Sequence, residues 1–263
     1  MLRSPSMGTS AESNHPQPIR ANQIREGERY ELSEGRKIYC QPTGGRGAGG
    51  TVSGGAALAT DPAVNEAGFD PGYSPDANTL RAPDIAVGNV PNAPGWILGA
   101  PPLAVEYADT GQDEQALTDK IKELLEAGTR YLWVVRLDGP RRVEVHEPDR
   151  KIRIFGEGDE LEAPGVLQNP VPVRALYDRE AAHEVTLRNL LQRKGYASLE
   201  ALQAASKTEG AREGLVAGIE ALCNSLSIEF GAARREQLEA LGVDELRELL
   251  NAVSNERTWP SSG

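Results

Sequence analysis

The spacing of apolar residues changes near Tyr177, and this change constrains the fold more than any other feature of the sequence. Before it, apolar residues come in short runs that are continuous or alternate with polar residues, as in β-strands. After it they recur every three or four residues, as on the buried face of an α-helix. The pattern predicts a mixed α/β domain over residues 23–176 and a helical region over residues 177–258. The flanking residues 1–22 and 259–263 are expected to be disordered tails.

The mixed domain starts with an expected hairpin and a glycine-rich segment. Residues 29–32 and 36–39 are short alternating runs, and Gly35 between them favours a tight turn. Residues 41–60 are rich in glycine, but no Lys-Ser or Lys-Thr follows the glycines, so a phosphate-binding P-loop is excluded. We expect this segment to be a flexible loop.

Further elements are expected in a definite order. The pattern predicts strands at residues 84–87, 103–107 and 131–135, and a helix at residues 113–127 before the third strand. The third strand is apolar throughout, so both of its faces should be covered. A hairpin with one wet face is expected over residues 142–154.

Two acidic residues on these strands are the main candidates for chemistry. Asp84 opens one strand and Glu106 lies inside the next, and each has an alanine two residues away on the same face. A carboxylate in an apolar strand is costly unless a cation or a donor compensates its charge. Two such carboxylates that meet would bind Mg²⁺, which polarises a phosphoryl oxygen. The alternative is structural: Glu106 pairs with an arginine, for instance Arg81 or Arg130, and Asp84 caps a turn after Pro83.

The order of the motifs resembles the Uma-type family of putative restriction endonucleases, within the PD-(D/E)XK nuclease superfamily. The resemblance is carried by residues 29–35, 81–87, 102–107 and 120–135. The match covers roughly residues 24–173. It implies a restriction-endonuclease-like fold of class α/β (mixed α+β), with a central mixed sheet flanked by helices and the helical region appended. It also implies an endonuclease that hydrolyses DNA phosphodiester bonds.

The resemblance implies site residues, a cofactor and partners. Asp84 and Glu106 match the metal-binding acids, and Glu31 matches an upstream glutamate that adds a ligand or orients water. The implied cofactor is Mg²⁺ or Mn²⁺, and the implied partner is DNA. A homodimer is expected, because nucleases of this fold often act as dimers to cut two strands.

The resemblance also points to one lysine. In the superfamily the lysine is expected two residues after the glutamate, but this chain has Ala108 there. In the Uma-type family the lysine lies on the following helix instead. Lys120 matches that position. On that helix Lys120 is closer than Lys122 to the apolar stripe, so its long stem can lean toward the sheet. Lys120 would stabilise the attacking hydroxide or the charge on the phosphate.

The sequence departs from the family at two places. Many members carry a histidine soon after the first hairpin, whereas this chain has none between His15 and His146. Asp109 stands where the family has a serine. These departures leave the metal acids intact but favour a second hypothesis, an interaction or regulatory protein that keeps the nuclease fold with weakened or absent cleavage. A third hypothesis is a metal-dependent hydrolase of another phosphate ester.

Charge and cysteine content limit the function classes further. The formal net charge of -11 argues against non-specific DNA coating, which needs Lys and Arg for phosphate contacts. It does not exclude a nuclease, because a bound metal brings its own positive charge. Two cysteines, Cys40 and Cys223, exclude a disulfide framework and fit a reducing cytoplasm. No run approaches the roughly 18 apolar residues that a membrane span needs, and residues 1–22 lack the apolar core of a secretory signal.

Overall fold

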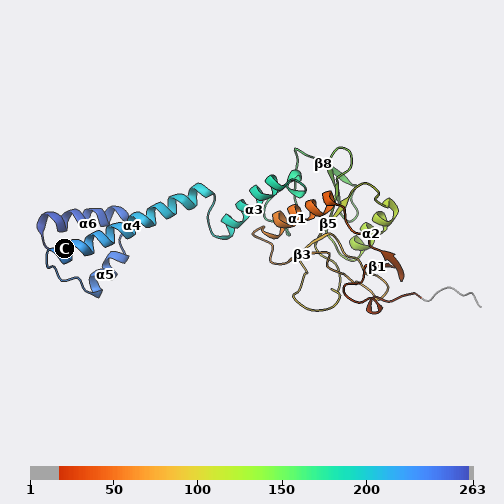
Figure 1. The fold of residues 1–263 in the computed structure, drawn as a ribbon, viewed down its shortest axis with the longest axis horizontal. Coiled ribbons are helices and arrows are strands. Elements are labelled where there is room, and N and C mark those ends of the chain that lie inside the picture. Colours follow the sequence, from red (N-terminus) through yellow and green to blue (C-terminus); the bar gives the residue numbers. More distant parts are fainter. Residues whose placement is uncertain (1–17, 261–263) are drawn as a thin grey trace, which may run out of the picture. The chain divides into compact units, whose positions relative to one another are not determined.

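The computed structural model describes residues 18–260. The chain divides into two compact units, Met1–Leu190 and Leu191–Gly263. The first unit contains a six-stranded sheet with helices, and the described part of the second unit is helical (Figure 1). Within the described residues, no helix combines the length and the apolar character that crossing a membrane requires.

The central sheet of the first unit has the strand order β3-β4-β5-β6-β7-β8. All neighbouring strands are antiparallel except β5 and β6, which are parallel. The strands are β3 (Ala67–Phe69), β4 (Ile85–Val87), β5 (Leu103–Ala108), β6 (Tyr131–Arg136), β7 (Arg142–His146) and β8 (Arg153–Gly156). The predicted central mixed sheet flanked by helices is therefore confirmed.

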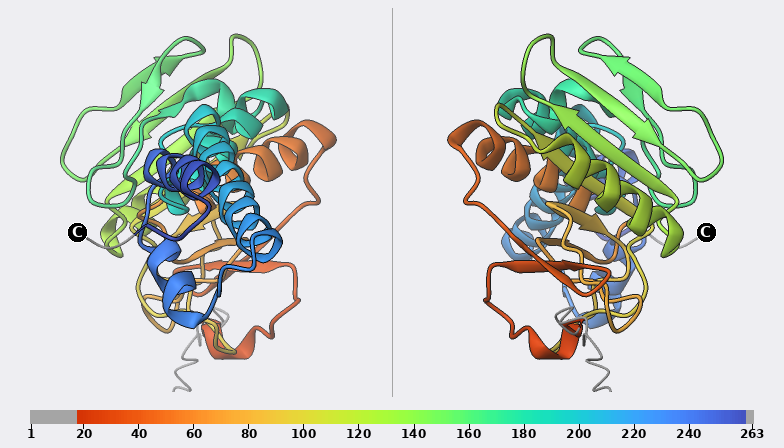
Figure 2. Two further views of the ribbon diagram at one scale, coloured as in Figure 1. Left: turned by 90° about the vertical axis from the view of Figure 1, so that its left-hand side faces the viewer. Right: turned by 90° about the vertical axis from the view of Figure 1, so that its right-hand side faces the viewer.

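Helix α2 (Glu114–Glu126) makes the crossover that the parallel pair β5-β6 requires. It begins after Asp113, whose carboxylate accepts hydrogen bonds from two backbone amides of the first turn. It is followed by Gly128, which has a φ of 112°. Figure 2 shows α2 lying across the strands of the sheet. The apolar side chains shared by α2 and this face of the sheet are Ala104, Ala108, Leu117, Leu124, Leu132 and Val134.

The other face of the sheet is covered by helix α1 (Gly45–Ala59), so the prediction of a flexible glycine-rich loop was wrong. The glycines let α1 lie close to β5: a Cβ added to Gly50 would come within 2.7 Å of the Tyr107 ring. The Tyr107 hydroxyl lies 2.8 Å from the Gly50 carbonyl oxygen and 2.7 Å from that of Leu176. Glycine disfavours an isolated helix, but here it permits packing that a larger residue would prevent.

A hairpin, β1 (Tyr30–Ser33) and β2 (Arg36–Tyr39), lies outside the central sheet, and its prediction is confirmed. Leu32 of β1 packs with Ala21, Ile24 and Leu80 in a small apolar cluster. Residues 1–17 of the expected N-terminal tail (1–22) lie outside the described residues. The rest of it, from residue 18, packs against this hairpin and includes the short 3-10 helix η1 (Ala21–Gln23).

The remaining elements complete the two units. In the first unit, β9 (Glu160–Leu161) pairs with β10 (Val171–Pro172), and the 3-10 helix η2 (Val173–Leu176) leads to α3 (Arg179–Arg193). Val185 of α3 belongs to the main apolar core, so the division between the units falls inside α3 and not at residue 177.

The second unit packs its helices around a core of its own. The helices are α4 (Leu199–Ser225), α5 (Ala232–Glu239) and α6 (Val243–Glu256). The buried side chains between them are Ile219, Cys223, Leu238, Leu246 and Val253. Trp259 packs against Phe230 with ring centroids 6.2 Å apart, so packing extends beyond the expected boundary at residue 258.

The packing of α1 can be tested with one pair of alanine variants. Gly50→Ala is expected to lower the free energy of unfolding by about 1–3 kcal/mol, because its Cβ overpacks against the Tyr107 ring. Gly49 is exposed on the same helix, and an added Cβ there meets nothing within 4 Å. Gly49→Ala should therefore raise the same free energy by up to about 1 kcal/mol through helix propensity. Urea denaturation measures both, and equal effects of the two variants would contradict the close packing of α1.

Candidate functional site

The pairing of β4 with β5 brings Asp84 and Glu106 together. Ala86 lies opposite Ala104 in this antiparallel pair, and the register ends with Ile85 opposite Val105. Asp84 comes directly before β4 and Glu106 directly after Val105, and both residues line the same cleft. Opposite residues in such a pair share one face, with Cβ atoms about 5 Å apart. The two alanines occupy the neighbouring positions on that face and leave room around the carboxylates.

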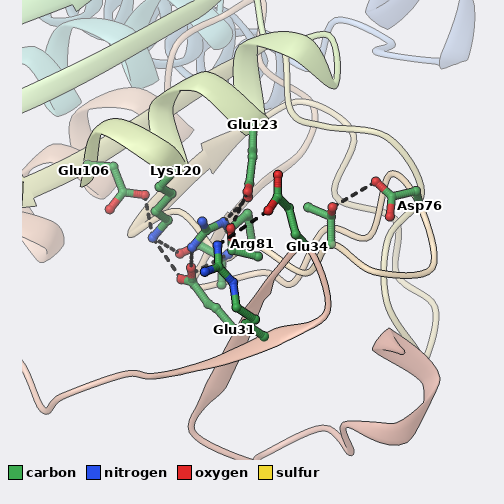
Figure 3. A network of polar contacts seen from close by, with 11 residues as sticks. Glu31, Glu34, Asp76, Arg81, Glu106, Lys120 and Glu123 are labelled. Carbon is green, nitrogen blue, oxygen red and sulfur yellow. Dashed lines mark hydrogen bonds and ion pairs between the residues drawn. The ribbon is translucent and has the colours of Figure 1, made fainter. Parts of the chain in front are cut away.

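Helix α2 places Lys120 over the same face. The Lys120 Nζ lies 2.8 Å from Glu106 Oε1 and 3.0 Å from Glu31 Oε1, and it donates a hydrogen bond of 2.7 Å to the Ala82 carbonyl oxygen. The Lys120 side chain is 13% exposed, whereas that of Lys122 is 71% exposed. The lysine closer to the apolar stripe is thus the one that reaches the acids (Figure 3).

A second cation holds Glu31 from its other side. The Arg81 guanidinium is almost fully buried and lies 2.9 Å from Glu31 Oε2 and 2.5 Å from Glu123 Oε2. The Ser33 hydroxyl donates to the other oxygen of Glu123 at 2.6 Å. Glu31 therefore bridges Arg81 and Lys120, and α2 contributes both Lys120 and Glu123 to one network (Figure 3).

Among the described residues no arginine forms an ion pair with Glu106, so the arginine alternative for Glu106 was wrong. Arg81 pairs with Glu31 and Glu123, and Arg130 donates to the Gly165 carbonyl oxygen. The basic partner of Glu106 is Lys120. Asp84 accepts a hydrogen bond of 2.7 Å from the Tyr107 backbone amide, which ties it to β5.

The pKa values of the four groups follow from burial and from their mutual contacts. Burial raises the pKa of Glu106 to about 8, the carboxylates of Asp84 and Glu31 add to this shift, and Lys120 only partly offsets it. Burial likewise raises the pKa of Asp84. Burial opposes the charge of Glu31, but Lys120 and Arg81 outweigh it and lower the Glu31 pKa. Burial also opposes the charge of Lys120, but the carboxylates of Glu106, Glu31 and Asp84 raise its pKa.

These shifts fix the charges of the site near neutral pH. Glu31 is ionised and Lys120 is protonated, so the two form a stable ion pair. Glu106 holds a proton over much of the neutral range. One lysine therefore does not supply enough positive charge for the buried carboxylates around it.

The four residues line a cleft of about 720 Å³, which we call the site cleft. Its acidic lining residues are Glu31, Asp70, Asp84, Glu106 and Asp113, and its basic ones are Arg81 and Lys120. Arg46 does not line it and instead forms an ion pair with Asp109, the residue at the position of the family serine. The lining of the cleft is thus acidic.

Two members of the site were not expected from the sequence. Glu123 follows Lys120 by three residues, so the shared face of a helix was the available signal. Asp70 directly follows β3 with a φ of 53°, in the left-handed region. Burial raises its pKa, Glu31 and Asp84 add to the shift, and Lys120 opposes it. The sequence indicated Asp70 only weakly, as an acidic residue that stands before Pro71 at the end of a short strand.

The donor chemistry of Asp84 and Glu106 fits a hard divalent cation. Both carboxylates line the site cleft, and both are oxygen donors of the kind that such a cation prefers. Mg²⁺ is usually bound by one or two carboxylates and keeps several waters. Within residues 18–260, however, no group of three or more His, Cys, Asp or Glu side chains is arranged to hold a metal. The fit therefore rests on two carboxylates with water completing the shell.

The ion network predicts a large loss of stability when Lys120 is removed. Lys120→Met is expected to lower the free energy of unfolding by about 3–5 kcal/mol at slightly alkaline pH, because it leaves buried carboxylates without their cation. Lys122→Met is the matched control on the exposed side of α2 and should change this free energy by less than about 0.5 kcal/mol. Urea denaturation of both variants checks the difference, and a near-neutral Lys120→Met would contradict the buried ion pair.

The raised pKa of Glu106 predicts how stability depends on pH. Its folded pKa of about 8 lies above the ordinary value of 4.5, so the folded state binds this proton more tightly. The contribution to stability is full below the ordinary value and is lost as the pH rises through 8. Glu106→Gln cannot ionise, so its free energy of unfolding should not show this loss between about pH 5 and about pH 9. The difference in free energy of unfolding between the variant and the wild type should therefore shift in favour of the variant as the pH rises. Glu126→Gln, at an exposed site on α2, should follow the wild-type curve, and parallel curves for all three proteins would refute the shift.

Comparisons with known proteins show the family to which the chain belongs. The family model Uma2, described as a putative restriction endonuclease, matches residues 17–173. The crystal structure of a putative nuclease from Anabaena variabilis ATCC 29413 superposes with a TM-score of 0.52 at 19% identity, covering 63% of this chain and 99% of that chain. At this identity the likeness shows a shared fold. No curated protein matches the chain. Since the family model spans more than half of its length, the chain belongs to the Uma2 family of putative restriction endonucleases.

Proposed function

We propose that the chain is a metal-dependent endonuclease that hydrolyses DNA phosphodiester bonds. The observation that carries the proposal is that Asp84 and Glu106 line one open cleft, with Lys120 in contact with Glu106. Membership of the family supports a nuclease. The proposed cofactor is Mg²⁺ or Mn²⁺, held by Asp84 and Glu106.

The reaction requires water to replace one ester oxygen on phosphorus. The water oxygen forms a bond to phosphorus, one phosphorus–oxygen ester bond breaks, and the leaving oxygen takes up a proton. A bound divalent cation would polarise the phosphoryl oxygen and lower the pKa of the water.

The chain's own residues position charge around that reaction. Lys120 stays protonated, so it acts as a fixed positive charge near the phosphate and not as a base. Glu31 holds the Lys120 ammonium in place, and Arg81 holds Glu31. The backbone amide of Tyr107 orients Asp84. Glu31 and Arg81 are thus positioning residues for Lys120.

A second candidate is a nuclease-fold protein that binds a partner without cleavage. The acidic lining of the site cleft favours it, because DNA phosphates would meet more carboxylates than basic groups there. Arg46, a candidate cation for the cleft, is already paired with Asp109. Hydrolysis of a smaller phosphate ester is a third possibility with the same acid pair. A cytoplasmic location and a homodimer remain predictions.

Plasmid cleavage separates these candidates. With Mg²⁺ or Mn²⁺ the wild type is expected to convert supercoiled plasmid into nicked and linear forms, and EDTA should abolish this. Asp84→Asn keeps the side-chain shape but removes its charge, so the cleavage rate should fall by about 100-fold or more. Glu126→Gln is the control for charge loss at an exposed site and should keep the wild-type rate.

The remaining outcomes of the plasmid assay each favour a different conclusion. Equal cleavage by the wild type and Asp84→Asn would refute the assignment of Asp84. Cleavage by neither protein, with both folded, would favour the non-cleaving candidate. Hydrolysis of a small phosphate ester without plasmid cleavage would favour the third.

A further inference from the structure

Helix α2 holds the chain segment that leads into β4 at two points. This segment comprises residues 81–84 and ends in the acid that directly precedes β4. Lys120 donates a hydrogen bond of 2.7 Å to the Ala82 carbonyl oxygen. Nearly one turn further along α2, Glu123 Oε2 lies 2.5 Å from Arg81 Nε. Residues three apart on a helix are neighbours on its surface, so one stretch of α2 contacts both the backbone of the segment and its arginine.

The Glu123 carboxylate is held through both of its oxygens. The Ser33 hydroxyl donates to Oε1 at 2.6 Å, and Oε2 pairs with Arg81 (Figure 3). The Glu123 side chain is 17% exposed and that of Arg81 only 2%. Hydrogen bonds between ionised groups are strong, and burial strengthens them further. By contrast, Glu126 on the same helix is 65% exposed, and its cation lies 3.8 Å away. Glu123 is therefore fixed in place and can fix Arg81 in turn.

The glutamates of this network match the two buried cations. Arg81 lies between Glu123 and Glu31, and Lys120 also pairs with Glu31. Two negative charges thus stand against two positive ones. The charges of the two proposed metal ligands are left over, although Lys120 also contacts one of these ligands. Carboxylate oxygens in excess of the local cations are what a divalent cation such as Mg²⁺ or Mn²⁺ binds.

We infer that Glu123 is a positioning residue for the proposed metal site and acts through Arg81. By holding Arg81 to α2, it fixes Asp84, three residues further along the chain, relative to the Lys120 ammonium. By matching the Arg81 charge, it leaves Glu31 as the counter-ion of Lys120, so that the metal ligands need not take this part. Glu123 does not line the site cleft, so it is not itself a ligand. The inference rests on the proposed metal-dependent function and deepens it.

Mn²⁺ binding without DNA tests the inference, measured from the electron paramagnetic resonance signal of the free ion. Glu123→Gln keeps the shape of the side chain and loses its charge. The Mn²⁺ affinity should fall about 10-fold or more, as when an outer partner of a metal ligand is lost. Glu123→Asp keeps the charge on a shorter side chain and should lie between Glu123→Gln and the wild type. Asp84→Asn sets the scale, because it removes a proposed ligand.

Two controls separate positioning from a general loss of stability. Glu126→Gln removes a carboxylate from an exposed site of α2 and should keep the Mn²⁺ affinity within about two-fold. Val185→Ala opens a cavity in the main core, at a residue that does not line the site cleft. It should lower the melting temperature and leave the Mn²⁺ affinity unchanged. Glu123→Gln should also lower the melting temperature, because it leaves the buried Arg81 with one carboxylate. Only its loss of Mn²⁺ affinity distinguishes a positioning role.

The outcomes separate the inference from the proposed function. Wild-type Mn²⁺ affinity in Glu123→Gln, with weakened binding by Asp84→Asn, would overturn the inference and leave the metal site standing. An equal loss of affinity in Val185→Ala would also overturn it, since any destabilisation would then suffice. Should Glu123→Gln not fold, wild-type affinity in Glu123→Asp would have the same meaning.

Two further results concern the metal site and the nuclease. Equal Mn²⁺ affinity in Asp84→Asn and the wild type would refute the metal site and, with it, the inference. Weakened Mn²⁺ binding by Glu123→Gln, with no plasmid cleavage by the wild type, would uphold the inference and refute the nuclease.

Discussion

The contact of the Lys120 ammonium with the carboxylates of Glu31 and Glu106 is the interaction on which the rest of the first unit depends. It joins the hairpin strand β1 to two elements that are distant from it in sequence, the central strand β5 and helix α2. The hydrogen bond from Lys120 to the Ala82 carbonyl oxygen adds the segment that leads into β4. Burying these charges is costly, so the hairpin, the sheet and the helix must all be in place before the network is favourable.

The same interaction creates the chemical character of the site. Lys120 neutralises part of the charge of Glu31 and Glu106, and burial leaves Glu106 with a pKa of about 8. A cation bound by Asp84 and Glu106 would supply the missing positive charge and would leave Lys120 free to face a phosphate. The structure thus ties stability and proposed activity to one side chain, as is common where buried groups have shifted pKa values.

Much of the fold could be predicted from local pattern, and the misses have identifiable causes. The first hairpin, helix α2 and the central strands were recognised because the periods of two and 3.6 residues are visible in the sequence. Helix α1 was missed because glycine is a poor helix former. In this protein the glycines have no side chain that would prevent close contact between α1 and Tyr107. The division between the units was also displaced, because α3 looks like the helices after it but packs Val185 into the first core.

The sequence by itself determined the succession of elements, the two acids on apolar strands and the face of α2 on which Lys120 lies. These depend on neighbours along the chain, so they can be read locally. Only the tertiary structure decided the partners: Arg81 bonds to Glu123 across 42 positions, and Ser33 to Glu123 across 90. It also decided that Asp84 and Glu106 line one cleft, because β4 pairs with β5 at Ile85 and Val105. Such choices depend on burial and distance, which exist only once the sheet, the hairpin and the helix have packed together.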